Sequence, residues 1–281
     1  GRPEIAFATI FESHPLIFAP TELSTTAPLK LQAPKYGFRA ATLPGFLPEM
    51  VPALRLDYGE VDARVRRLAG LLDAAEGAAV RFEVAGRRLE LFLDLRFRKA
   101  HVSGGLIPTP GTAGNLPSGE AYIVPYEGEV PGEPSRTEGK MPVEFDGEVV
   151  VYDITANRAV AVEPGGEAAG REAALLHAEP AYGNLAELGL GVLADFGVEP
   201  VGAVLLDEKL GLHIAFGRSD HFGGQVGPAQ FSSPRAVVHL DRVYLPAIQP
   251  QVHVLAVDLI DPEGLAHPLM RDGRYVISFA R

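Results

Sequence analysis

The sequence predicts an α+β protein: a small mixed α/β segment over residues 1–105, then a strand-rich, mostly antiparallel domain over residues 106–281. Three observations favour this class. Short apolar runs separated by glycine and proline recur along the chain, as is typical of strands and turns. Only two segments have the spacing or composition of a longer helix. The Gly104-Gly105 pair marks the expected boundary between the two parts.

The N-terminal segment is expected to begin with short strands and turns, because prolines divide its first 50 residues into short apolar pieces. From Asp57 the apolar residues recur at helical spacing with charged residues between them, which predicts an amphipathic helix. Two runs on either side of Ala85-Gly86, residues 80–84 and 89–95, then predict a β-hairpin. The apolar residues that define the helix are Val61, Val65, Leu68 and Leu71 or Leu72.

The segment after residue 105 is predicted to be rich in strands, since its apolar runs are short and bounded by glycine and proline. One helix is expected over Glu167–Ala178, where good helix formers precede Pro180 and Gly183. The predicted strands cover residues 121–126, 149–154, 201–206, 212–216, 236–240, 252–259 and 275–279.

Composition excludes several classes of protein. The 281 residues include no cysteine, which rules out disulfides, thiolate zinc sites, iron–sulfur clusters and cysteine nucleophiles. No uncharged apolar run approaches the roughly 18 residues of a membrane helix. No basic segment followed by an apolar one begins the chain, so we expect a cytoplasmic protein without a membrane partner.

Charge is distributed unevenly along the chain. Residues 1–105 contain 14 basic and 12 acidic side chains, whereas residues 106–281 contain 11 basic and 24 acidic ones. The overall net charge of −11 argues against nucleic acid as a partner. An acidic field attracts metal ions or the ammonium group of a substrate, although a solubilising acidic surface explains the same charge.

Several familiar catalytic motifs are missing. The sequence has no Gly-Lys-Ser/Thr phosphate loop, no His-Glu-x-x-His helix and no Gly-x-Ser-x-Gly elbow. The segment Gly189-Leu-Gly-Val-Leu-Ala194 matches a loose dinucleotide fingerprint, which requires a strand before it and a long helix after it. Neither is predicted here, because residues 180–188 are not a clean strand and residues 195–200 cannot open a long helix.

The most specific candidate site consists of His239 and Asp241. Residues two apart on a strand point to the same face, so this imidazole and carboxylate project together, as ligands of a divalent ion do. His213 points away from its apolar neighbours on another predicted strand, and Glu120 and Glu187 each follow a small residue. Each also has a structural interpretation: a surface ion pair, a hydrogen-bonded half-buried histidine, or an exposed carboxylate.

Four segments set these polar residues among glycine and apolar neighbours: Asn115-Leu-Pro-Ser-Gly-Glu120, Ala186-Glu-Leu-Gly-Leu-Gly191, Asp207-Glu-Lys-Leu-Gly-Leu-His-Ile-Ala-Phe-Gly217 and His239-Leu-Asp241. Together, and in this order, they resemble the motifs of the aminopeptidase T/aminopeptidase S family of metallopeptidases, over about half the chain.

This resemblance implies an enzyme that removes N-terminal residues from peptides. It implies two divalent ions per chain, zinc, cobalt or manganese, that share a glutamate and bind a water, in a dimeric hollow particle. Carried over, the metal-binding residues are Glu120, Glu187, His213, His239 and Asp241, with Glu120 as the expected bridge. Glu187 or Glu208 would act as the acid/base carboxylate.

Two departures from the family pattern are visible. Its members have a substantially larger N-terminal domain than the 105 residues that precede the first motif here. They also place a tyrosine near the metals a few residues after the first histidine, where this chain has Asp220 and His221. His221 is therefore the candidate for a replacement ligand, proton donor or oxyanion stabiliser, and the alternative is a polar loop without catalytic function.

Two other functions remain open. A related fold resembling this family is that of iron-dependent 2,5-dihydroxypyridine dioxygenase, and His213, His239 and Asp241 are the ligand types of a mononuclear iron(II) oxygenase. The missing tyrosine and Ser219 favour this reading slightly. The third function is a non-catalytic metal-binding relative, which the short N-terminal region suggests.

Overall fold

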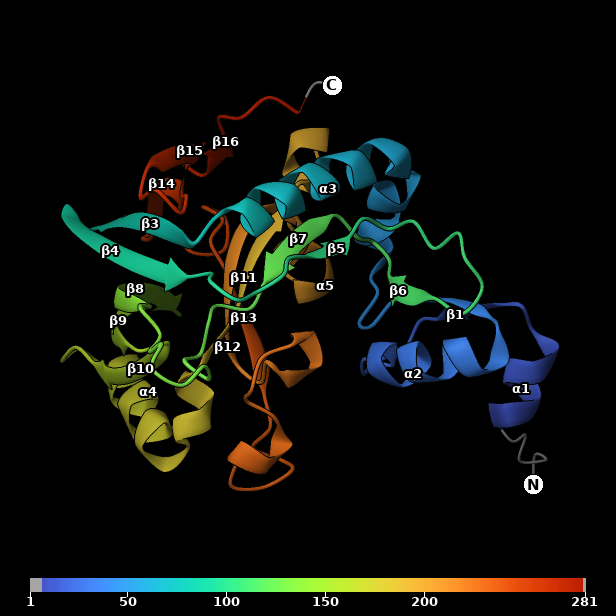
Figure 1. Cartoon of the computed structure of the whole chain (residues 1–281), viewed down its shortest axis with the longest axis horizontal. Helices are drawn as coiled ribbons and strands as arrows, with labels where there is room; N and C mark the ends of the chain where they lie inside the picture. Colours follow the sequence, from blue (N-terminus) through green and yellow to red (C-terminus); the bar gives the residue numbers. More distant parts are fainter. Residues whose placement is uncertain (1–6, 280–281) are drawn as a thin grey trace.

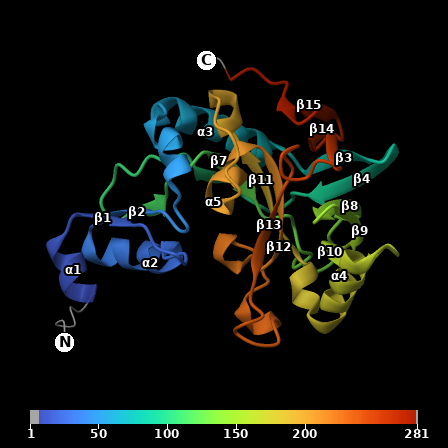
Figure 2. The same ribbon diagram turned by 180° about the vertical axis from the view of Figure 1, so that it is seen from behind.

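Three β-sheets form the framework of residues 7–279, the part of the chain that the computed structural model describes. A small lobe around α1 and α2 lies beside a larger body that contains the other helices and the two larger sheets (Figure 1). The view from behind shows the same separation between lobe and body (Figure 2). The protein is therefore α+β, as predicted. Within residues 7–279, no helix is long and apolar enough to cross a membrane.

The lobe is a parallel three-stranded sheet, in the order β1-β2-β6, with two helices packed beside it. The prediction of only short strands and turns is wrong here, because α1 and α2 are helical and residues 48–55 form a 3₁₀ helix. Pro28 lies in the first turn of α2, where a backbone N–H has no helical partner to lose. The elements are α1 (Phe7–Ser13), β1 (Leu16–Ala19), α2 (Thr26–Tyr36), β2 (Arg39–Thr42) and β6 (Ala113–Asn115).

The helix predicted from Asp57 is confirmed as α3 (Tyr58–Ala74). The Asp57 carboxylate accepts hydrogen bonds from the backbone N–H groups of Gly59 and Glu60, which caps the helix N-terminus. The apolar stripe of α3 is buried in the main core, as its spacing predicts: Val61, Val65, Leu68 and Leu72.

The largest sheet has eight antiparallel strands in the order β10-β9-β8-β4-β3-β14-β15-β16. The predicted hairpin is confirmed as β3 and β4, with Ala85 and Gly86 at positive φ in the two-residue turn between them. The predicted helix is confirmed as α4 (Glu167–Ala178). The strands are β3 (Gly77–Val84), β4 (Arg87–Asp94), β8 (Glu138–Phe145), β9 (Glu148–Thr155), β10 (Arg158–Val162), β14 (His253–Ile260), β15 (Ala266–Arg271) and β16 (Arg274–Tyr275).

The second sheet of the body has five antiparallel strands in the order β13-β12-β11-β7-β5. Their bounds are β5 (His101–Ser103), β7 (Glu120–Ile123), β11 (Leu185–Gly191), β12 (Leu212–Gly217) and β13 (His239–Val243). The central strand β11 was not among the predicted strands, because one of its faces is made of glutamate and glycine rather than of strand-favouring residues. The segment that matches the dinucleotide fingerprint begins inside β11, contrary to the expectation that no strand leads into it, but no long helix follows it within residues 7–279.

Four predicted strands need correction. The strand predicted at 121–126 is β7, which already ends at Ile123. Residues 201–206 do not form a strand, because Gly202 has a positive φ and the Asp207 carboxylate accepts from the Val201 N–H, folding the chain into α5 (Val204–Asp207). The strand predicted at 236–240 begins only at His239, the residue that pairs with the last residue of β12. The strand predicted at 275–279 pairs with β15 only up to Tyr275.

Each of the three sheets combines strands from both sides of residue 105. The lobe takes β6 from the later part, the eight-stranded sheet takes β3 and β4 from the earlier part, and the five-stranded sheet takes β5 from it. The division into residues 1–105 and 106–281 stays a prediction.

Candidate functional site

One face of the five-stranded sheet carries the polar residues singled out in the sequence. Residues that pair across an antiparallel ladder place their side chains on the same face. The ladder pairs Gly189 with His213 and Tyr122, Gly191 with Glu120, Ala215 with Glu187 and Asp241, and Gly217 with His239. The acidic and histidine side chains therefore share this face with glycine and alanine, which leave room between them.

The opposite face of the same strands is apolar and lies in the main hydrophobic core. It includes Ile123, Leu188, Leu190, Leu212 and Ile214, all of which are buried. A one-residue slip in register would turn the charged face into this core, so the alternation fixes the register and with it the geometry of the site.

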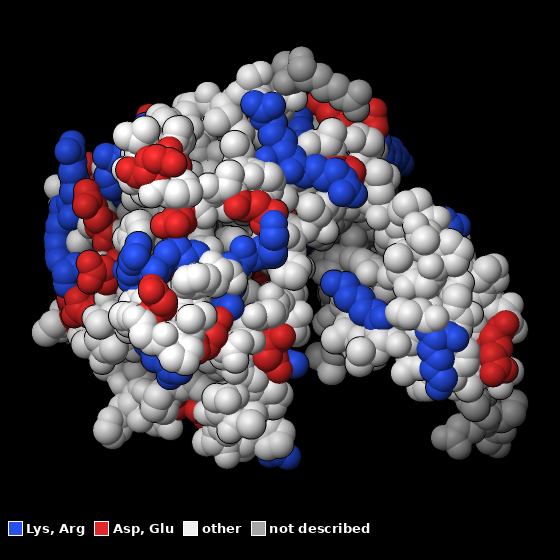
Figure 3. All heavy atoms as spheres, in the orientation of Figure 1, with Lys and Arg blue, Asp and Glu red and all other residues white. Residues whose placement is uncertain are grey.

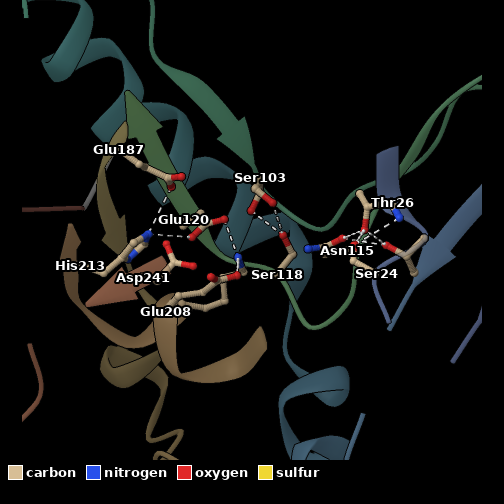
Figure 4. Close-up of polar contacts among 12 residues, drawn as sticks. Ser24, Thr26, Ser103, Asn115, Ser118, Glu120, Glu187, Glu208, His213 and Asp241 are labelled. Atoms are coloured by element: carbon tan, nitrogen blue, oxygen red, sulfur yellow. Dashed lines mark hydrogen bonds and ion pairs between the residues drawn. The ribbon is translucent and has the colours of Figure 1, made fainter. Parts of the chain in front are cut away.

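Two groups of possible metal ligands lie on the polar face. The first contains Glu120, Glu187 and His213, and the second contains Glu187, His239 and Asp241. Within each group, one ligand atom of every residue lies within 4.8 Å of the others. We call these five residues the carboxylate–histidine cluster, and Figure 4 shows four of them converging from neighbouring strands.

Glu187 belongs to both groups and uses a different oxygen for each. Its Oε1 lies 3.2 Å from His213 Nε2, and its Oε2 lies 3.1 Å from His239 Nε2. Glu187 therefore occupies the position of a bridging carboxylate, the role that the resemblance led us to expect for Glu120. Glu120 contributes to the first group only.

Two observations show that the donor set fits a cation. His239 Nδ1 lies 2.8 Å from the carbonyl oxygen of Arg218. A carbonyl oxygen can only accept a hydrogen bond, so Nδ1 carries a proton. In a neutral ring the lone pair is then on Nε2, which faces the carboxylate oxygens of Glu187 and Asp241. Glu120 Oε2 is buried and has no hydrogen-bond partner among residues 7–279. Acceptors that face acceptors in a buried site are satisfied by a positive ion.

The protonation equilibria of the cluster lead to the same conclusion. Burial alone would raise the pKa of Glu187, but hydrogen bonds from His213 and His239 outweigh it and lower the pKa to about 2. Burial would lower the pKa of His213, but its hydrogen bond with Glu187 and nearby carboxylates raise it to about 9. In the absence of a metal, protons on the imidazoles supply the positive charge that these carboxylates require.

Lys209 is buried between two carboxylates beside the cluster. Its Nζ lies 2.5 Å from Glu120 Oε1 and also forms an ion pair with Glu208. Burial would lower the pKa of Lys209, but the two carboxylates outweigh it and raise the pKa, so the ammonium stays charged. Lys209 therefore holds Glu120 by one oxygen and leaves its other oxygen directed at His213, 3.6 Å away.

A cleft of about 710 Å³ opens over the cluster, and the lobe forms its opposite wall. Figure 3 shows the surface hollowed between lobe and body. The body contributes the cluster, except for the fully buried His213, together with Glu208 and Lys209. The lobe contributes α2 and the residues before it, and the segment around Asn115 borders the cleft between the two walls. The volume suits a ligand of a few residues or a small aromatic molecule.

Aromatic rings line the cleft next to His239. Tyr122 stacks on His101 with ring centroids 5.0 Å apart and lies 4.7 Å from the Phe222 ring. The ring of His221 lies 5.2 Å from that of His239, so the structure places this predicted residue beside the cluster but in neither ligand group. Burial and repulsion from His239 lower the pKa of His221 to about 4, which leaves its ring neutral at pH 7.

Sequence reasoning missed three residues of the cleft. Tyr122 follows Glu120 by two positions, so strand alternation predicts that both side chains share a face. Tyr122 thus brings a tyrosine to the cleft from β7, and not from the segment after His213 where the sequence comparison expected one. Lys209 stands inside the recognised Asp-Glu-Lys segment. No sequence pattern indicated Lys30, because nothing in the sequence predicts that α2 lies opposite this sheet.

Gly189→Ala is expected to disrupt the cluster. A Cβ at Gly189 would fall well inside van der Waals contact of the His213 ring, which fills the space above it. Since His213 cannot keep its position, we expect metal affinity to fall at least about tenfold and the free energy of unfolding to drop by about 1–3 kcal/mol. Metal titration and urea unfolding measure the two effects.

The matched control is Gly70→Ala in α3, where a Cβ meets no atom within 4 Å. That variant should keep its metal affinity and gain some stability, because alanine favours the helix. Equal metal affinity in the two variants would contradict the role given to Gly189.

Comparison with known proteins finds similar folds among solved structures. No protein-family model and no curated protein sequence matches the chain. A solved structure of 2,5-dihydroxypyridine dioxygenase from Pseudomonas putida KT2440 superposes with a TM-score of 0.66 at 15% identity, over 96% of this chain and 74% of that one. Wild-type AmpT from Thermus thermophilus superposes with a TM-score of 0.53 at 18% identity, over 90% of this chain and 79% of that one.

These similarities establish a shared fold at a distance. AmpT corresponds to the family that the four motifs resemble, and the dioxygenase is the enzyme named as a related fold for the alternative function. Such a fold is used by enzymes, and the cluster offers ligands for a metal ion.

Proposed function

We propose that this chain is a metal-dependent aminopeptidase that removes N-terminal residues from peptides. The observation that carries the proposal is the position of Glu187, whose two oxygens each face one of two three-residue ligand groups. Such a shared carboxylate is typical of sites that hold two divalent ions roughly 3.5–4 Å apart. The fold similarity to AmpT and the four motifs support the same reaction class.

Divalent ions held by the cluster would lower the pKa of a water molecule and polarise the carbonyl of the scissile peptide bond. The residues of the chain perform the remaining tasks. Glu208 lies on the cleft wall outside both ligand groups, and burial raises its pKa to about 8. In this proposal its ionised form accepts the proton of the attacking water and returns it to the leaving amine. Burial raises the pKa of Tyr122, so its hydroxyl remains a hydrogen-bond donor to the developing oxyanion. The excess of carboxylates attracts the free ammonium of the peptide.

The first experiment is elemental analysis of protein purified without chelator or affinity metal, followed by leucyl-anilide cleavage. About two zinc, cobalt or manganese ions per chain with cleavage support the proposal. Glu120→Ala and His239→Ala should lose metal and activity together. Full activity in either variant would contradict it.

A second function is favoured by the aromatic lining of the cleft. Tyr122 and Phe222 line the cleft beside His239, with Tyr122 stacked on His101 behind it and Phe222 edge-on to His239, and such a surface suits a planar ring substrate. In this alternative the chain holds one iron(II) ion and opens an aromatic ring, as a dioxygenase does. The ligands expected from the sequence, His213, His239 and Asp241, fall in two different ligand groups, so the ion would be held by Glu187, His239 and Asp241. About one iron per chain with substrate-dependent oxygen uptake would establish this function instead.

Two further expectations belong to the proposal. A homodimer is expected from the resemblance, and light scattering of the purified protein tests it. A protein that neither contains nor gains metal, and whose melting temperature no added divalent ion raises, would point to the non-catalytic alternative.

A further inference from the structure

The lobe wall of the cleft carries a cation that faces the carboxylate–histidine cluster. Lys30 lies on α2 and lines the cleft. Partial burial and repulsion from Lys209 lower the pKa of Lys30 while Glu120 raises it, so charges on both walls act on one another across the space. No ion pair or hydrogen bond of the Lys30 side chain is found among residues 7–279, although Glu22 lines the same cleft. Lys30 is therefore available to an anion in the cleft.

Asn115 supplies an oriented donor in the same cleft. Its Oδ1 accepts hydrogen bonds of 2.7 Å from the hydroxyls of both Thr26 and Thr42, which fixes the amide. The Asn115 nitrogen points away from these threonines, toward the side where the cluster lies (Figure 4). Thr26 and Lys30 are one helical turn apart, so they share the face of α2 that borders the cleft. A fixed amide N–H and a free ammonium thus border one space.

We infer that Lys30 and Asn115 form a subsite for a carboxylate of the substrate, across the cleft from the carboxylate–histidine cluster. An ammonium and a fixed amide N–H give a carboxylate one charge-assisted and one neutral hydrogen bond. The subsite rests on the proposed function for its substrate class, which is short peptides whose C-terminal carboxylate reaches Lys30 while the N-terminal residue lies at the cluster. For the ring-cleaving alternative, the same subsite would bind a carboxylate on the ring.

The test compares peptide acids with their C-terminal amides, using Leu-Gly, Leu-Gly-Gly and Leu-Gly-Gly-Gly in the metal-loaded protein. At the peptide length that spans the cleft, we expect KM of the acid to be about tenfold or more below KM of the amide. Lys30→Ala should remove this difference by raising KM of the acid with kcat little changed, and Lys30→Arg should restore most of it. Asn115→Asp keeps the acceptor for both threonines but repels the carboxylate, so it should raise KM of the acid further.

Lys35→Ala is the matched control, since Lys35 lies on α2 over the Tyr36 ring and does not line the cleft. It removes the same charge and should leave the acid preference intact. If the protein cleaves acids and amides with equal KM, or if both lysine variants behave alike, the subsite is wrong while the aminopeptidase function stands.

Titration calorimetry separates the opposite case. If the metal-loaded protein cleaves no peptide but binds an acid at least tenfold more tightly than its amide, and Lys30→Ala abolishes that preference, the subsite stands and the peptidase proposal fails. The pair 2,5-dihydroxybenzoate and its amide serves as the ring-substrate arm of the same titration. The inference would be overturned if no acid binds, or if every acid binds equally well to the wild-type protein and to Lys30→Ala.

Discussion

Glu187→Gln is expected to reduce metal content from about two ions per chain to one or fewer and kcat/KM by roughly a thousandfold, equivalent to about 4 kcal/mol of activation free energy. The amide keeps the volume of the side chain but replaces one ligand oxygen with an N–H₂ group that repels cations. Because Glu187 is the residue that both ligand groups share, no other single substitution in the cluster removes an oxygen from both sites. Elemental analysis and steady-state kinetics measure the two effects.

Glu179→Gln provides the matched control for this change. Glu179 is also buried, but its carboxylate accepts hydrogen bonds from Ser232 and is outside the cluster. We expect this variant to keep its full metal content and activity. Retention of two ions per chain in Glu187→Gln would show that the shared position is not a bridge.

Lys209→Met is expected to destabilise the metal-free protein by about 3–5 kcal/mol. The lysine side chain is 1% exposed and pairs with Glu120 and Glu208, whose side chains are 7% and 14% exposed. Methionine fills a similar volume but leaves two buried carboxylates without a counter-ion, the change that makes a broken buried ion pair costly. Urea unfolding in the presence of a chelator measures the effect, and added divalent metal should recover part of the loss by supplying positive charge to Glu120.

Two variants test the electrostatic explanation. Adding Glu120→Gln to Lys209→Met removes one uncompensated charge, so the double variant should be more stable than Lys209→Met alone. Lys99→Met changes a lysine that is 82% exposed and should alter stability by less than about 0.5 kcal/mol. A loss below about 1 kcal/mol in Lys209→Met would show that water or protonation already relieves these carboxylates.

Local patterns predicted much of the fold. The apolar spacing after Asp57 gave α3, and the runs around Ala85-Gly86 gave the β3–β4 hairpin, because both depend on residues close in the chain. Strand β11 escaped prediction because its alternate positions Glu187, Gly189 and Gly191 serve the site rather than a core. Helix α2 was not predicted, because prolines usually interrupt a helix. Pro28, however, lies in the first turn of α2, where a helix tolerates proline.

Local patterns also predicted part of the candidate site. Alternation alone predicted that His239 and Asp241 share a face, and their paired atoms lie 3.5 Å apart. The same rule, applied to Glu120, would have found Tyr122. Two features of the site depend on packing between residues far apart in the chain, which no local sequence pattern predicts. One is that both ligand groups share Glu187. The other is the contact between Lys209 and Glu120, which are 89 positions apart.

The short connection between β6 and β7 limits how the cleft can change its width. Strand β6 ends at Asn115 in the lobe sheet and β7 begins at Glu120 in the cluster, so one continuous tether of four residues joins the two walls. The Cα atoms at its ends can never be more than about 18 Å apart. A displacement of the Asn115 end therefore reaches the ligand Glu120 within four residues of backbone, the shortest of the chain connections between the lobe and the body.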